Sequence, residues 1–209
     1  MARGLFISVE GIDGSGKSTQ LEHLTKRLDL EGIQYLLNRE PGGSAVGMQI
    51  RQIVLDPKNP VSPTAELLLY FANRAQNVDE QIRPALEQGK LVISDRYTDS
   101  TLAYQGAARD LGQDLVSRLH AIACRGTEPT LTIYLRIRPE VSANRLRNAK
   151  KDRLEAEGAA FHARVYEAYE ALAAAQPERI VPVNGERGEG SIADDIWRIL
   201  MKRWQRRDS

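Results

Sequence analysis

Short apolar runs alternate along this chain with longer segments of helical periodicity. Five runs have the length and side-chain content of buried strands; they are residues 5–10, 35–39, 91–95, 130–135 and 179–183. Seven segments repeat apolar residues every three or four positions, as amphipathic helices do; they are residues 18–30, 46–55, 64–86, 113–124, 140–148, 159–175 and 192–206. This alternation predicts an α/β fold in which helices cover both faces of a five-stranded parallel sheet.

The first strand leads directly into a candidate phosphate-binding loop. Residues 11–18 read GIDGSGKS and match the pattern G-x-x-x-x-G-K-[ST] between a predicted strand and a predicted helix. In such a loop, backbone N–H groups surround phosphate oxygens and the helix directs its positive end at them. An ordinary glycine-rich turn is the alternative, and the strand–loop–helix context argues against it. The expected nucleotide-binding residues are Gly11, Ile12, Asp13, Gly14, Ser15, Gly16, Lys17, Ser18 and Thr19.

Two stretches interrupt the alternation of strands and helices. Residues 56–63 form a proline-rich connector, and residues 149–158 form a dense run of charges. Most charge runs are solvated loops, but beside a phosphate loop we interpret this one as a lid over phosphates, spanning about residues 145–158. The length of 209 residues fits one domain, residues 1–209, that buries about 70% of the surface of its unfolded chain.

Composition and charge narrow the class of protein. The formal net charge is +1, so bulk electrostatics do not point to a nucleic acid or a membrane as a partner. Cys124 is the one cysteine, which indicates a reduced structural thiol. The N-terminus shows no signal-peptide pattern, and no apolar run approaches the ~20 residues of a membrane-spanning helix. We therefore expect a soluble, cytoplasmic protein.

Charged residues follow the predicted strands at the sheet edge where α/β proteins bind ligands. Asp95 ends an apolar strand, and beside a phosphate loop we expect it near Mg²⁺ or its water shell. Arg96 follows at once, and its planar guanidinium suits a second anionic phosphate. Other arginines, each taken singly, would be surface ion pairs, but together they indicate a site that neutralises two phosphate-bearing anions; they are Arg51, Arg74, Arg145, Arg147 and Arg153.

Two further segments contribute candidate ligands. Residues 40–43 read EPGG and form a tight turn, from which Glu40 either projects into the site or shapes the loop. The segment after Arg96 gathers hydroxyls, an amide and aromatic rings, which suit a planar base with hydrogen-bonding edges; a polar loop surface is the alternative. Its members are Tyr97, Thr98, Asp99, Ser100, Thr101, Tyr104 and Gln105.

Five segments in this order resemble the thymidylate kinase (dTMP kinase) family, of the bacterial type with a lid arginine. They are residues 6–19 (FISVEGIDGSGKST), 39–43 (REPGG), 95–97 (DRY), 103–106 (AYQG) and 152–155 (DRLE). The resemblance implies a nucleoside-monophosphate-kinase fold with a lid. It also implies transfer of the γ-phosphoryl group of ATP to dTMP in dTTP synthesis, with Mg²⁺, and it suggests a homodimer.

The resemblance implies three catalytic residues, Lys17, Arg96 and Arg153, and two metal ligands, Ser18 and Asp95. Lys17 would reach the β- and γ-phosphates of ATP, and Arg147 would lie against the adenine. Gly14 has no side chain where some relatives carry a loop arginine. The positive charge for the transferring phosphoryl group would then come from Arg153 as the lid closes.

The same resemblance implies how dTMP is bound. Asp13 would face the sugar 3′-hydroxyl, and Arg74 would hydrogen-bond the thymine edge. Tyr70 would supply the aromatic face under the base, with the adjacent Phe71 as the alternative. The other implied substrate-binding residues surround the nucleoside or hold its phosphate; they are Glu40, Arg51, Arg96, Ser100, Thr101, Tyr104 and Gln105.

Two other functions fit less well. A deoxynucleoside kinase needs a carboxylate that helps to deprotonate a sugar hydroxyl, whereas the phosphate of dTMP is ionised near neutral pH, and the number of arginines favours a phosphate acceptor. A nucleotide-switch GTPase carries an Asn-Lys-x-Asp motif, but residues 148–152 read NAKKD, which is one residue too long.

Overall fold

The computed structural model describes residues 4–148 and 151–206 and confirms the predicted five-stranded parallel sheet flanked by helices. The strands β1 (Leu5–Glu10), β2 (Tyr35–Arg39), β3 (Leu91–Asp95), β4 (Leu131–Arg136) and β5 (Ile180–Asn184) lie in the order β2-β3-β1-β4-β5. Two of the predicted strands are displaced by one residue. In the part of the chain that the structure describes, no helix is long and apolar enough to cross a membrane.

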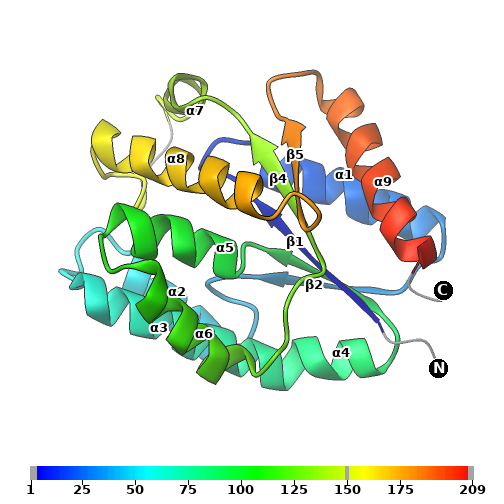
Figure 1. The fold of residues 1–209 in the computed structure, drawn as a ribbon, viewed down its shortest axis with the longest axis horizontal. Coiled ribbons are helices and arrows are strands. Elements are labelled where there is room, and N and C mark those ends of the chain that lie inside the picture. The colour runs from blue at the N-terminus through cyan, green and yellow to red at the C-terminus, as the bar shows by residue number, and fades with distance from the viewer. Residues whose placement is uncertain (1–3, 149–150, 207–209) are drawn as a thin grey trace.

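Helices lie on both sides of the sheet (Figure 1), and apolar side chains on its two faces form separate cores. On one face, Ile7 and Val9 of β1 pack against α1 (Lys17–Leu30) and α9 (Glu189–Gln205). On the other face, Phe6 packs with side chains of α3 (Pro63–Asn77), α4 (Arg83–Glu87) and α6 (Gln113–Cys124). A third core joins α2 (Ala45–Leu55), α8 (Ala159–Ala175) and β5. The central strands β1 and β3, whose residues are all buried, are therefore held between two layers of helices.

Three helical segments differ from the prediction. The helix expected over residues 64–86 is α3 followed by a π-helical turn, η1 (Val78–Ile82), and then α4. The segment after Tyr97 is helical, with α5 (Thr98–Thr101) running into the π-helical η2 (Leu102–Ala108). Its polar residues are buried toward the site, so the apolar periodicity that marks a helix is missing. Last, the segment 140–148 is the shorter α7 (Pro139–Arg145).

The predicted lid, residues 145–158, includes residues 149 and 150, which lie outside the described residues. Its described part begins in the last turn of α7 and resumes at Lys151, ahead of α8. Asp152 accepts hydrogen bonds from the backbone N–H groups of Leu154 and Glu155, so this end of the segment forms a local turn. That the chain forms one domain with a mobile lid stays a prediction.

Strand register brings the polar strand ends to one edge of the sheet. Val9 lies opposite Asp95, and Arg39 also lies opposite Asp95. The loops that follow β1, β2 and β3 therefore meet at the same place, as the carboxyl ends of parallel strands do in open α/β sheets. This edge carries the candidate site.

Candidate nucleotide-binding site

A cavity of about 670 Å³ opens at this edge of the sheet. Most of the predicted site residues line it; they are Asp13, Gly14, Ser15, Gly16, Lys17, Ser18, Thr19, Glu40, Arg51, Tyr70, Arg74, Asp95, Arg96, Ser100, Thr101, Tyr104 and Gln105. They come from loops and helices far apart in the sequence, so the fold gathers them into one volume large enough for a drug-sized ligand.

The phosphate loop has the backbone that its pattern predicts. Gly16 precedes α1 at φ 93°, and Gly11 has φ 143°, in the region that favours glycine. A Cβ atom on Gly11 would lie 2.6 Å from the carbonyl oxygen of Leu135. The buried Lys17 Nζ donates to the carbonyl oxygens of Gly11 (3.0 Å) and Ile12 (3.2 Å). Burial, together with the nearby Arg96, lowers the pKa of Lys17 to about 8.

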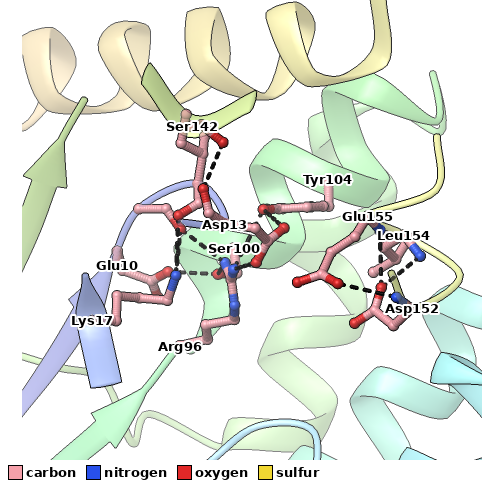
Figure 2. Close-up of polar contacts among 12 residues, drawn as sticks. Glu10, Asp13, Lys17, Arg96, Ser100, Tyr104, Ser142, Asp152, Leu154 and Glu155 are labelled. Atoms are coloured by element: carbon pink, nitrogen blue, oxygen red, sulfur yellow. Dashed lines mark hydrogen bonds and ion pairs between the residues drawn. The ribbon is translucent and has the colours of Figure 1, made fainter. Parts of the chain in front are cut away.

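Arg96 lies at the centre of the polar contacts (Figure 2). Its Nη2 is 2.5 Å from Asp13 Oδ1, and its Nη1 donates to the Gly11 carbonyl and to Ser100 Oγ, each at 3.1 Å. Tyr104 donates its hydroxyl to Asp13 Oδ2 at 2.9 Å. Although burial favours the neutral acid, Arg96 and Lys17 lower the pKa of Asp13, so this carboxylate is ionised.

Glu10 lies behind Arg96 and is fully buried. Its Oε1 accepts from the Tyr97 N–H at 2.7 Å; its Oε2 accepts from Ser100 Oγ at 2.5 Å and from the Tyr169 hydroxyl at 3.0 Å. Burial, with the nearby charge of Asp99, raises the pKa of Glu10 to about 7. The sequence analysis assigned this carboxylate no role, because it reads as the polar end of a strand.

Arg74 forms a second buried centre, on the side of the cavity lined by α3. It pairs with Glu40, with its Nε 2.7 Å from Glu40 Oε2, and it donates to the Thr101 hydroxyl at 3.0 Å. Its guanidinium lies 5.0 Å from the ring centroid of Phe71 and 4.8 Å from that of Tyr97. These contacts hold the guanidinium rigidly against the cavity wall.

Phe71 is therefore packed in the core behind Arg74, while Tyr70 lines the cavity. Of the two aromatic candidates, the one that faces the site is Tyr70, one helical turn before Arg74 on α3. The spacing of four residues is the signal that places both side chains on the same face of the helix.

Oxygen atoms that suit a divalent cation line the same cavity. Asp95 is 8% exposed, and its Oδ1 has no hydrogen-bond partner among the residues that the structure describes, while its Oδ2 lies 3.6 Å from Arg39 Nε. The Ser18 hydroxyl lines the cavity with it. Mg²⁺ is bound by one or two carboxylates together with substrate phosphates rather than by a cage of protein ligands. No cluster of three or more acidic, histidine or cysteine ligands occurs among residues 4–148 and 151–206.

Five predicted site residues do not line the cavity; they are Gly11, Ile12, Phe71, Arg147 and Arg153. The two arginines have partners elsewhere. Arg147 is exposed and donates to Asn144 Oδ1 at 2.9 Å. Arg153 is directed toward α2 and α3: its Nε donates to the Val54 carbonyl at 2.8 Å, and its Nη2 pairs with the buried Glu66. Neither side chain reaches the phosphate loop in this structure.

Two further side chains donate hydrogen bonds to the phosphate loop, and the sequence singles out neither of them for that role. Ser142 Oγ donates to the Asp13 carbonyl at 2.6 Å. Arg145 lines the cavity, where Nη1 donates to the Gly14 carbonyl and Nη2 to the Gly185 carbonyl, each at 3.0 Å. Arg145 was one of several arginines beside the charge run, and no local signal distinguishes it from Arg147.

Comparison with known proteins gives a consistent answer. A family model described as Thymidylate kinase matches residues 9–196. Proteins named thymidylate kinase include one from Synechococcus sp. (strain JA-2-3B'a(2-13)), which is 45% identical over 199 residues, or 95% of each chain. Another, from Deinococcus radiodurans, is 43% identical over 204 residues, covering 97% of this chain and 99% of the relative. A third, from Caldanaerobacter subterraneus, is 47% identical over 183 residues, or 88% of each chain.

The raised pKa of Glu10 predicts a pH-dependent difference in stability between the wild type and Glu10→Gln. The native carboxyl group keeps its proton up to about pH 7, whereas the unfolded chain loses it near the usual value of 4.5. The wild type therefore loses stability relative to the variant as the pH rises, by about 2–3 kcal/mol between pH 5 and 8. Urea unfolding at both pH values measures it, and parallel pH profiles would contradict the prediction.

Proposed function

The chain belongs to the thymidylate kinase family, and we propose that the cavity at the sheet edge carries the transfer of the γ-phosphoryl group of ATP to dTMP. The observation that carries this proposal is that Arg96, which is bound to the phosphate loop, lines one cavity with the buried Arg74–Glu40 pair. An oxygen of the dTMP phosphate bonds to the γ-phosphorus while the bond to the β–γ bridging oxygen breaks, giving dTDP and ADP. The attacking phosphate is already ionised near neutral pH, so no general base is needed.

On the ATP side, the phosphate loop would bind the β- and γ-phosphates. The loop N–H groups and the N-terminus of α1 provide partial positive charge, and Lys17 provides a full one. Lys17 would then exchange its bonds to the loop carbonyls for phosphate oxygens. Because Arg145 lines the cavity and Arg147 does not, we propose Arg145 for the contact with the adenine.

On the dTMP side, Arg74 and Tyr70 would bind the base. Arg74 is fixed by Glu40 and Thr101, so its donors are oriented before the base arrives. Tyr70 lines the same wall and supplies the ring under the thymine. Gln105, which is buried at 2% exposure, donates to Glu66 and completes the pocket.

The remaining contacts of dTMP are to its sugar and its phosphate. Asp13 would meet the 3′-hydroxyl, and Tyr104 already binds the other oxygen of this carboxylate. Arg51 and Arg96 would hold the acceptor phosphate, with Ser100 beside them. An arginine on each side of the phosphate would orient it for in-line attack.

Ser18 and Asp95 would hold Mg²⁺. Asp95 lines the cavity, and its buried Oδ1 has no hydrogen-bond partner among the described residues; Ser18 lines the same cavity and follows Lys17 at the start of α1. The ion would neutralise charge on the phosphates when it is bound. The residues of the chain itself contribute orientation and the exclusion of water.

Arg153 is proposed to act on closure of the lid. In this structure its guanidinium pairs with Glu66, and its backbone N–H donates to the Leu55 carbonyl at 3.1 Å. Glu66 is fully buried and also accepts from Arg109 at 3.3 Å, so it keeps a cationic partner when Arg153 leaves. When Arg153 leaves, the buried carboxylate of Glu66 therefore still has a cation beside it. A buried carboxylate without such a partner would be strongly destabilising.

A homodimer is proposed from the exposed apolar side chains on three neighbouring helices. α3 packs against both α2 and α6. Their large exposed apolar residues are Val46, Met48 and Ile53 on α2, Leu68 on α3, and Leu115 and Ile122 on α6. Burial of such a surface against a second copy would remove it from water.

Substrate choice tests the proposed function. With ATP and Mg²⁺, a coupled assay of ADP release should show the fastest turnover for dTMP in a panel with dUMP, dCMP, dGMP and thymidine. Thymidine leaves Arg51 and Arg96 without the phosphate that they would hold. Faster turnover of thymidine than of dTMP would overturn the assignment of a monophosphate acceptor.

Arg153→Ala should lower kcat by about 10³-fold if the side chain stabilises the transferring phosphoryl group as an arginine finger does. Arg125→Ala is the control, because Arg125 pairs with Asp79 at the surface and does not line the cavity. Steady-state kinetics at saturating ATP and dTMP measure both variants. An unchanged kcat for Arg153→Ala would remove this residue from the catalytic machinery.

The dimer proposal is tested by light scattering. The wild type should have twice the mass of one chain, and Ile122→Glu, which places a charge on the exposed face of α6, should shift it toward the monomer. A wild type that is monomeric at micromolar concentration would contradict the proposal.

A further inference from the structure

Glu10 takes no part in the transfer as described, although it is the buried carboxylate nearest to Arg96 along the hydrogen bonds of Figure 2. We propose that Glu10 is a positioning residue: it holds both the backbone and the guanidinium of Arg96 in the geometry that binds the acceptor phosphate. This inference rests on the proposed role of Arg96. It explains why a carboxylate lies beneath the phosphate loop in a region that no substrate reaches.

The backbone of Arg96 requires such an anchor. Its φ is 70°, in the left-handed region, which is unfavourable for a residue with a side chain. Three hydrogen bonds surround it: its own N–H donates to the Val9 carbonyl at 3.1 Å, Ser94 Oγ donates to its carbonyl at 2.7 Å, and the N–H of Tyr97 donates to Glu10 Oε1 at 2.7 Å. Glu10 thus binds the peptide group between Arg96 and Tyr97, directly after the residue with the positive φ.

The side chain of Arg96 is held through two hydroxyl groups. Ser100 Oγ lies 3.1 Å from Arg96 Nη1 and 2.5 Å from Glu10 Oε2, and the Tyr169 hydroxyl lies 3.5 Å and 3.0 Å from the same two atoms. A guanidinium can only donate, so each hydroxyl accepts from Arg96 and turns its single hydrogen away from it. That hydrogen faces Glu10 or the other hydroxyl, since Ser100 Oγ and the Tyr169 hydroxyl lie 2.8 Å apart. The chain of donors runs in one direction, from Arg96 through Ser100 and Tyr169 to the carboxylate.

These hydrogen bonds keep their direction, from Arg96 toward position 10, only if the side chain at position 10 accepts them. Above about pH 7 the ionised carboxylate offers two oxygens and no hydrogen, which matches the three donors that converge on it. In Glu10→Gln, one oxygen becomes an NH₂ group of nearly the same size. At least one donor then faces another donor, and a hydroxyl hydrogen turns toward Arg96. The guanidinium is displaced although little volume has changed.

Burial and the charge of Asp99 favour the neutral acid at position 10, while Arg96 and Lys17 favour the carboxylate, and the balance raises the pKa of Glu10 to about 7. A neutral side chain of the same shape would fill the space without this desolvation penalty. What the carboxylate adds is its set of acceptors, directed at the residues around Arg96.

A double-mutant cycle between Glu10 and Arg96 tests the inference. Glu10→Gln should lower kcat with dTMP by about 10²-fold, as expected when a catalytic group is displaced by about 1 Å. Arg96→Ala should lower it at least as much. In the Arg96→Ala background, Glu10→Gln should change neither kcat nor the Kd of dTMP, measured by calorimetry, by more than about twofold, because its effect passes through Arg96.

Glu170→Gln is the matched control. It replaces another carboxylate by its amide, but the partners of Glu170 are Tyr134 and Arg136 rather than the groups around Arg96, and Glu170 does not line the cavity. Its effect on kcat should be small and the same in both backgrounds. Where Glu10→Gln fails to fold, Tyr169→Phe serves in the same cycle, since it removes one of the two hydroxyls between Glu10 and Arg96.

The possible results of this cycle distinguish a failure of the inference about Glu10 from a failure of the proposed role of Arg96. A wild-type kcat for Arg96→Ala overturns the role of Arg96 and the inference with it. A loss for Arg96→Ala alone, with Glu10→Gln at the wild-type rate, retains Arg96 and overturns the inference. Losses that multiply in the double variant also overturn it, because they show that Glu10 acts independently of Arg96.

Discussion

The register of β1 between β3 and β4, with β2 beyond β3, is the constraint on which the site depends. Asp95 lies opposite both Val9 and Arg39, so the three loops that leave β1, β2 and β3 begin at the same height. A slip of one residue would turn every side chain of a strand to the opposite face. It would also move Arg96 away from the phosphate loop, whose Gly11 carbonyl it binds. The two cores that cover the sheet hold this register, because each buries alternate residues of β1.

The site meets its own hydrogen-bonding needs in the absence of substrate. Lys17 donates to carbonyls of its own loop, and Arg96 donates to Asp13 and Ser100. Phosphate oxygens can replace these acceptors one for one, so binding exchanges one set of hydrogen bonds for another and creates no buried unpaired charge. The buried cations are thereby kept in place before the anions arrive, which is the condition for electrostatic catalysis.

Sequence alone predicted the parts of the site that are contiguous in the chain. The phosphate loop could be read from residues 5–30 because its strand, glycines and lysine follow one another. The segment 98–108 could not be recognised as helical, because its buried face carries Ser100, Thr101 and Gln105 in place of apolar residues. Glu10 has no local signal at all, since its partners Tyr97 and Tyr169 lie 87 and 159 residues away. Which arginine reaches the cavity likewise depended on tertiary structure, as Arg145 and Arg147 show.

Arg145 joins two loops that lie far apart in the sequence and are therefore synthesised at different times. It links the carbonyl of Gly14 in the first loop to that of Gly185 after the last strand, and Gln20 of α1 donates to the Glu189 carbonyl at 3.1 Å. A nascent chain therefore lacks one wall of the nucleotide cavity until residues 185–192 have left the ribosome and docked. Because a ligand stabilises only the state that binds it, a ligand of this cavity would stabilise chains in which residues 185–192 have docked and would not stabilise chains that lack them.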